Sequence, residues 1–209
     1  MGHAGGDLHG ARSVPSGDQD TLFSSVCECR LDDGTIVQFR PITMSDVPAC
    51  ESMLCSCSRK SLYSRYERII TSTPRELAEE LCGDCAEGDL TVAAVVPDVN
   101  LPIAGVAQLI SDPNLEAAEY AVLVADPWQG RGLGGALTSF CLRAAEDLGI
   151  GRVIAEFLPD NMRMIRILEI RDFSLHRDLQ ERVVCGQKLI RDGGSKREAS
   201  GSSSHQEPE

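Results

Sequence analysis

Apolar residues recur along the chain with two periods, and each period predicts one kind of element. Short runs rich in apolar and β-branched residues, separated by turn residues, predict strands, which lie at 25–31, 35–42, 90–96, 103–110, 116–125, 152–158, 173–177 and 182–190. Apolar residues spaced three or four apart behind capping residues predict helices, which lie at 43–57, 61–70, 73–84, 132–148 and 161–170.

The order of these elements indicates the fold class. The three strands from 90 to 125 follow one another as a meander, and the helix at 132–148 then connects them to the strand at 152–158. Strands before and after a central βαβ unit imply a mixed α/β fold, with one mixed sheet and helices on both of its faces.

The two ends of the chain have a different composition from the middle. Residues 1–24 and 192–209 are rich in small and polar residues and carry few large apolar ones. Such segments bury too little apolar surface to order themselves. We therefore expect a disordered N-terminal tail at 1–24, one folded domain at 25–191 and a disordered C-terminal tail at 192–209.

Composition and charge narrow the range of functions. The net charge of −12 argues against a nucleic-acid partner, because phosphates would be repelled, and favours a cationic one. No apolar run approaches the roughly 20 residues that cross a bilayer, and the first residues lack the pattern of a signal peptide. We therefore expect a cytoplasmic protein with no membrane partner.

The nine cysteines are an odd number in a chain with no export signal, which favours free thiols over a disulfide framework. They form close pairs, but only Cys82 and Cys85 have the two-residue gap common in zinc sites. We expect no metal. Cys141 falls on the inner face of the helix at 132–148, where we expect it to pack rather than to react.

One segment between a predicted strand and a predicted helix is rich in glycine, and it reads Gln129-Gly130-Arg131-Gly132-Leu133-Gly134-Gly135. Glycine lets backbone N–H groups approach phosphate oxygens closely, because no side chain is in the way. The helix that follows adds unpaired N–H groups and the positive end of its dipole, which together hold an anion. The segment therefore predicts a phosphate-binding loop.

Two other kinds of phosphate loop fit this segment poorly. A P-loop requires Gly-Lys-Ser/Thr, which does not follow here. The dinucleotide pattern G-x-G-x-x-G is present at Gly130, Gly132 and Gly135, but it follows a meander rather than opening the first βαβ unit. Glu156 follows the loop at about the sequence separation expected of the ribose-binding acid of NAD enzymes. It lies in the middle of its predicted strand, however, whereas that acid stands at the C-terminal end of a strand.

The run from Val124 to Gly134 contains Q-x-x-G-x-G and resembles the acetyl-CoA motif of the Gcn5-related N-acetyltransferases. The segment that begins Asp160-Asn161 is similar to the family's next motif, since it follows a predicted strand and opens a helix. Segments 39–42 with Asp46, 61–66 and 118–122 resemble bacterial protein lysine acetyltransferases of the Pat type. Together the similarity extends over about residues 36–190.

This resemblance implies an acetyl-CoA-dependent N-acetyltransferase of GNAT-like fold. Its sheet would be mixed but mostly antiparallel, with about six to seven strands, splayed at the fourth and fifth. Acetyl-CoA would be the cosubstrate, with the Asn161 side chain near the pantetheine or thioester end. The resemblance assigns the backbone groups of Val122 and Val124 to the pantetheine arm. It assigns to the pyrophosphate the backbone amides of Gln129, Gly130, Arg131, Gly132, Leu133, Gly134 and Gly135.

The sequence departs from the family at two points. The usual Leu-Gly-Phe after the second motif is Arg171-Asp172-Phe173, so an aspartate must take the left-handed position that favours glycine. The tyrosine that many relatives place on the last helix as a general acid has no counterpart, which leaves open the source of the proton for the CoA thiolate.

The chemistry of amine acetylation requires a base. A lysine has a pKa of about 10.4 and is protonated at neutral pH, so a carboxylate must remove its proton. Glu119 precedes the loop on its strand and matches the position that has this role in the Pat-type enzymes. We expect an amine acceptor on a lysine-bearing protein. A small-molecule amine acceptor and a non-catalytic acyl-CoA sensor remain alternatives.

Overall fold

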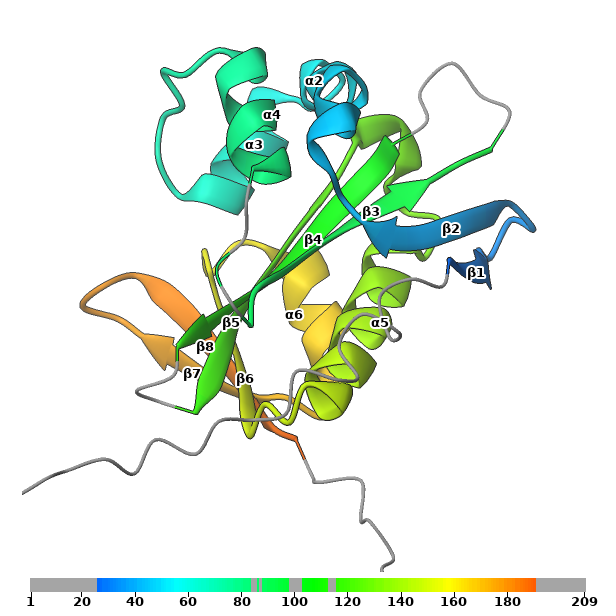
Figure 1. Ribbon diagram of the computed structural model, residues 1–209. Helices are drawn as coiled ribbons and strands as arrows, with labels where there is room; N and C mark the ends of the chain where they lie inside the picture. The colour runs from blue at the N-terminus through cyan, green and yellow to red at the C-terminus, as the bar shows by residue number, and fades with distance from the viewer. Residues whose placement is uncertain (1–25, 84–85, 87, 98–102, 113–115, 191–209) are drawn as a thin grey trace, which may run out of the picture.

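The computed structural model describes residues 26–83, 86, 88–97, 103–112 and 116–190. The predicted tails at 1–24 and 192–209 lie outside these ranges and remain predictions. Within them the chain forms one sheet with helices on both faces (Figure 1), which confirms the predicted mixed α/β class.

The sheet has eight strands in the order β1-β2-β3-β4-β5-β6-β8-β7. All neighbours are antiparallel except β5 and β6, which are parallel. The count exceeds the expected six to seven, since the first hairpin also joins the sheet. The strands are β1 Cys27–Arg30, β2 Ile36–Pro41, β3 Leu90–Val95, β4 Ile103–Asp112, β5 Ala117–Val124, β6 Arg152–Phe157, β7 Ser174–Asp178 and β8 Val183–Leu189.

The helices begin and end within a few residues of the predicted positions. They are the 3-10 turn η1 Met44–Asp46, α2 Val47–Cys55, α3 Arg59–Tyr66, α4 Pro74–Cys82, the 3-10 turn η2 Asp126–Trp128, α5 Leu133–Asp147 and α6 Met162–Glu169. One difference is at α3, which begins before the expected Ser61 and ends at Tyr66 rather than near Ile70. The Ser58 hydroxyl accepts a hydrogen bond from the Ser61 N–H and caps the helix there.

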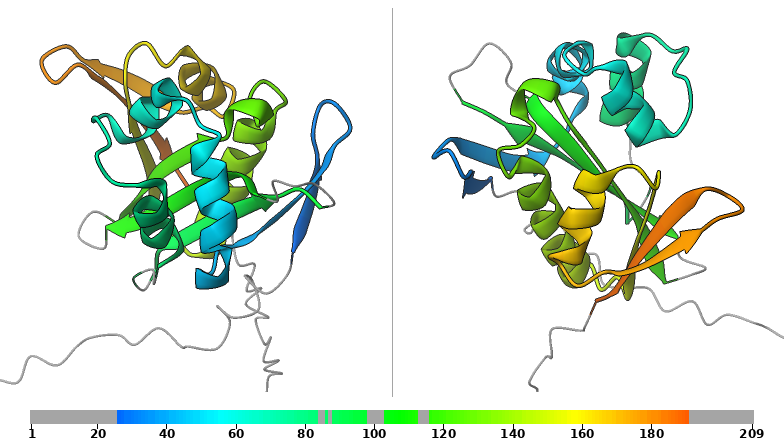
Figure 2. Two further views of the ribbon diagram at one scale, coloured as in Figure 1. Left: turned by 90° about the horizontal axis from the view of Figure 1, so that it is seen from above. Right: turned by 180° about the vertical axis from the view of Figure 1, so that it is seen from behind.

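Two apolar cores lie on the two faces of the sheet. On one face α5 packs Leu133, Leu137 and Cys141 against Tyr120 of β5 and Phe157 of β6. A buried hydrogen bond of 2.9 Å joins the Tyr120 hydroxyl to the Thr138 hydroxyl on α5. On the other face α2 and α4 cover the strands, as Figure 2 shows. The residues of that second core include Met53, Leu54, Leu77, Val106 and Leu123.

The parallel pair β5–β6 is short. Its register joins only Ala117, Ala118 and Glu119 to Arg152, Val153 and Ile154. Beyond Glu119 the remaining residues of β5 pair with β4 alone. The sheet is therefore splayed between these strands, which are the fourth and fifth of the expected fold once the extra N-terminal strand is set aside.

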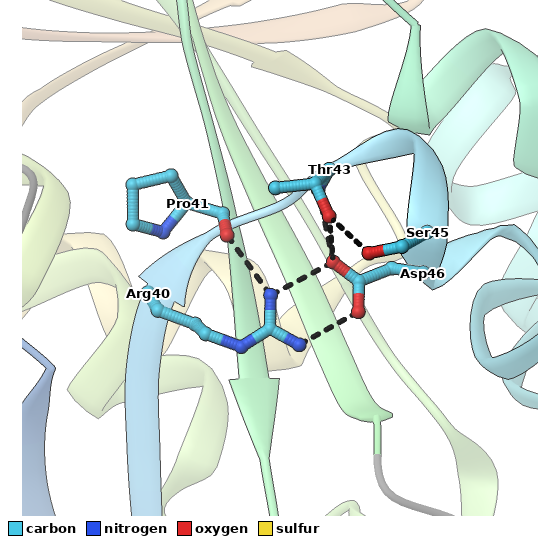
Figure 3. Close-up of polar contacts among 5 residues, drawn as sticks. All are labelled: Arg40, Pro41, Thr43, Ser45 and Asp46. Atoms are coloured by element: carbon cyan, nitrogen blue, oxygen red, sulfur yellow. Dashed lines mark hydrogen bonds and ion pairs between the residues drawn. The ribbon is translucent and has the colours of Figure 1, made fainter.

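A partly buried ion pair fixes the start of the helices on the second face (Figure 3). The Arg40 guanidinium donates to both oxygens of Asp46, at 2.7 and 2.6 Å, and the Thr43 N–H donates to the same carboxylate at 2.9 Å. The Arg40 hydrogen bond holds the pKa of Asp46 below its usual value. The contact ties β2 to the turn that leads into α2.

We expect Asp46→Asn to lower the free energy of unfolding at pH 7 by about 2 kcal/mol, since hydrogen bonds to charged groups each contribute about 1.5–3 kcal/mol. Because the native pKa is lowered, this contribution is present above the unfolded carboxyl pKa of about 3.9 and is lost as the pH falls through the native pKa. Urea unfolding at pH 7 and at pH 3 measures both effects.

Glu79→Gln is the control, because it removes one carboxylate from an exposed pair with Arg75 at 2.9 Å. An exposed pair on one helix contributes about 0.5 kcal/mol or less. Equal losses in the two variants would show that the Arg40–Asp46 pair does not anchor α2.

Candidate active site

A cleft of about 1080 Å³ lies at the splay of the sheet, between the end of β5, the glycine-rich loop, α6 and α3. Most residues singled out from the sequence line it. They are Val122, Val124, Gln129, Gly130, Gly132, Leu133, Gly134, Gly135 and Asn161. Arg131 and Glu119 do not line the cleft. That these residues bind acetyl-CoA stays a prediction.

The backbone of β5 presents polar groups to the cleft. The Ala125 N–H donates to Ala104 O at 3.0 Å, toward β4, whereas Val124 O accepts from the Gln129 side chain at 2.9 Å. In an antiparallel ladder, alternate residues direct their N–H and C=O groups to opposite sides of the strand. The backbone groups of Val122 and Val124 therefore face away from β4, toward the gap that β6 leaves open.

The loop after β5 needs glycine for conformational reasons. Gly130 has φ +77° and Gly132 has φ +85°, values that side chains disfavour. Leu133 then begins α5, a helix of 15 residues whose first N–H groups lie at the cleft. An anion at this position would meet both these N–H groups and the positive end of the helix dipole. The local geometry suits a phosphate group.

Arg131 is held away from the cleft. Its guanidinium pairs with Asp33 at 3.2 Å and lies over the Trp128 ring, 4.8 Å from the ring centre. The Asp32 N–H donates to Arg131 O at 3.4 Å, so the β1–β2 turn rests on the loop. No sequence signal links this turn to the loop. Only the Arg131 backbone amide thus remains a candidate for phosphate binding.

The Gln129 side chain connects three elements at the cleft. Its amide nitrogen donates to Val124 O, to the Ser61 hydroxyl of α3 at 3.0 Å and to Asp126 at 3.1 Å. Its amide oxygen accepts from Arg163 of α6. The Ser61 hydroxyl also donates to Asp126, at 2.6 Å. Gln129 is therefore a side-chain link between α3, β5 and α6.

The second motif folds as the sequence predicts. The Asn161 side chain accepts from the Met164 N–H at 3.1 Å and caps α6 while also lining the cleft. Past the other end of α6, Asp172 takes the left-handed conformation with φ +57° that was expected of it. Its neighbour Arg171 reaches back to α5 and donates to Gly135 O.

Glu119 is the last residue of β5 that pairs with β6, and its side chain is exposed. Strand alternation directs it to the face opposite Tyr120, hence away from α5. Glu156 of β6 shares this face. Burial, followed by repulsion from Glu156 and Glu119, raises the pKa of Glu67, which ends α3 with φ +54°. Three carboxylates are therefore close together here, and Glu67 carries no sequence signal that could have predicted it.

Among the described residues, no cysteine lines the cleft. Burial raises the pKa of Cys141 to about 12, so its thiol stays protonated at neutral pH and serves in packing. Within the described ranges, no three His, Cys, Asp or Glu side chains are placed to hold a metal ion. Over the same residues, every helix is too short or too polar to cross a membrane.

Comparison with known proteins identifies this arrangement. A family model described as "Acetyltransferase (GNAT) family" matches residues 59–173, more than half of the chain. The curated proteins searched contain no match.

Solved structures share the fold. The GNAT domain of PAT from S. lividans has a TM-score of 0.70 and 24% identity, over 79% of this chain and 97% of that one. The cAMP-binding acyltransferase from Mycobacterium smegmatis has a TM-score of 0.55 and 22% identity, over 82% of this chain and 49% of that one. The ribosomal-protein-S5-alanine acetyltransferase from Vibrio fischeri has a TM-score of 0.59 and 14% identity, over 75% of this chain and 94% of that one.

Substituting alanine at the two left-handed glycines tests the loop. Gly130→Ala is expected to lower the free energy of unfolding by about 1 kcal/mol, the cost of a left-handed alanine. Gly132→Ala carries the same cost plus a clash, because a Cβ there would lie 2.8 Å from the Asp32 carboxylate, whereas nothing lies within 4 Å at Gly130. Thermal unfolding measures the difference in Tm.

Repeating Gly132→Ala in an Asp32→Ala background isolates the clash. The extra loss of Tm is expected to disappear there. An equal loss at Gly130 and Gly132 would mean that the β1–β2 turn does not rest on the loop.

Proposed function

The chain belongs to the acetyltransferase (GNAT) family, and we propose that it transfers an acetyl group from acetyl-CoA to a primary amine, the ε-amino group of a protein lysine. The observation that carries this proposal is the end of β5. Its pairing with β6 stops at Glu119, the backbone groups of Val122 and Val124 beyond that point face a cleft, and the glycine-rich loop follows directly.

The residues of the cleft fit the parts of acetyl-CoA. The pantetheine arm, which carries amide groups, would hydrogen-bond to the backbone of Val122 and Val124 in the way that a neighbouring strand does. The N–H groups from Gln129 to Gly135 would hold the pyrophosphate at the start of α5. Asn161, at the start of α6, would lie beside the pantetheine or thioester end. Acetyl-CoA supplies the acetyl group as a thioester.

Glu119 is the proposed general base. It would take a proton from the acceptor ammonium, directly or through a water molecule, so that the neutral amine can attack the thioester carbonyl. The C–S bond would then break, and CoA would leave as the thiolate. The Val124 N–H, which faces the cleft with its own carbonyl, would donate to the oxyanion that develops. The amine and the thioester would thus meet where β5 leaves β6.

The charge of the acceptor side supports a lysine. Glu119, Glu156 and Glu67 gather on the sheet face opposite α5, and the chain as a whole carries a net charge of −12. A field of this sign attracts a cationic protein surface and raises its local concentration. A small amine acceptor would use the same base, and a sensor of acyl-CoA would bind without turnover.

We expect Glu119→Gln to lower kcat for acetyl transfer by about 100-fold or more, the usual contribution of a general base. The substitution keeps the size of the side chain and removes its charge, so acetyl-CoA should bind the variant as tightly as it binds wild type. Thiol release with a panel of lysine-bearing proteins and small amines measures turnover, and isothermal titration measures binding.

Glu116→Gln is the matched control, because Glu116 is also exposed and directly precedes β5. It should retain activity. Undiminished turnover in Glu119→Gln would remove Glu119 as the base, and binding without turnover across the whole panel would favour the sensor. Turnover with small amines alone would exclude the protein acceptor.

A further inference from the structure

The cleft differs in charge from the rest of the molecule. The chain has 20 basic residues against 32 acidic ones. Among the described residues, three acidic ones line the cleft, Asp32, Asp126 and Asp160, and the basic ones that line it are Lys60, Arg65, Arg163, Arg166 and Arg171. Three of these five arise from α6 or the residues just after it. A cleft of this composition attracts an anion despite the net negative charge of the chain.

Two of these arginines contact the two ends of the glycine-rich loop. Arg163, in the first turn of α6, donates to the Gln129 side chain at the start of the loop. Arg171, two residues past α6, donates to Gly135 O at its end. The loop therefore lies between two guanidinium groups from the same part of the chain.

The contacts of Arg171 fix it in place. Its guanidinium also donates to Ile167 O at 2.9 Å and to the Ser139 hydroxyl at 3.0 Å, and the Lys188 ammonium donates to Arg171 O at 2.7 Å. A side chain at Gly135 would collide with it, since a Cβ there would lie 2.7 Å from a guanidinium nitrogen. These contacts hold the end of α6 against the first turn of α5.

Arg163 is held differently. It is exposed, and its contact with the loop is to a neutral side-chain amide. A phosphate oxygen is a stronger acceptor for a guanidinium than an amide oxygen, and it can accept two parallel N–H bonds. Exchange of the amide for a phosphate therefore favours binding.

We propose that Arg163 is a phosphate-binding residue of this chain, which Gln129 holds beside the glycine-rich loop until a phosphate group of CoA replaces the amide. The inference rests on the proposed function, because it takes acyl-CoA as the ligand of the cleft. CoA offers two sources of this chemistry, the pyrophosphate and the 3′-phosphate.

Isothermal titration of CoA into the full chain tests the inference. Arg163→Gln is expected to weaken CoA binding about tenfold or more, as loss of a charge-assisted contact does. Its Tm should stay close to that of wild type, since Arg163 is exposed. Arg143→Gln, an exposed arginine of α5 that does not line the cleft, makes the same charge change and should bind CoA as wild type does.

Titration of 3′-dephospho-CoA distinguishes the two phosphate sources. If the Arg163→Gln loss persists with this ligand, Arg163 binds the pyrophosphate; if the loss disappears, it binds the 3′-phosphate. Equal CoA affinity in wild type, Arg143→Gln and Arg163→Gln would overturn this inference and leave the proposed function standing. A wild-type chain that binds no CoA would overturn the proposed function, and the inference with it.

Discussion

The early end of the β5–β6 pairing is the constraint on which the rest of the site depends. Among the strands that the structure describes, these two alone are parallel neighbours, and they have three paired positions before they separate. A parallel connection needs a crossover helix, which here is α5. Beyond Glu119 this side of β5 has no strand beside it in the ladder, and the same crossover brings the first turn of α5 to that open edge.

Local signals explain why so much of this fold could be predicted from the sequence. Proline and threonine mark the start of α4, and glycines mark the loop before α5, because these residues satisfy conformational or capping needs within a few positions. The resemblance to the family, whose pattern has glycine at this point, placed Asp172 in a left-handed conformation. The start of α3 was predicted too late, at Ser61, whereas Ser58 caps the helix and Arg59 begins it.

Contacts between distant segments could not be predicted in this way. Glu67 lies near Glu119 only because α3 packs on β5, and nothing in the sequence around either residue indicates the other. Arg131 matches the loop motif, yet its side chain pairs with Asp33 of the first hairpin, 98 positions away in the chain. A sequence motif can predict which backbone forms a loop, but tertiary packing decides where a long side chain in it points.

The contact between Gly135 and Arg171 also has a consequence for divergence among relatives. The guanidinium occupies the space that a side chain at position 135 would need. A lineage that keeps this arginine must keep the glycine, while one that has lost the arginine is free to acquire alanine or serine there. The order of such changes matters, since the larger residue at 135 is tolerated only after position 171 has changed. The two positions are therefore expected to evolve together, although 36 residues separate them.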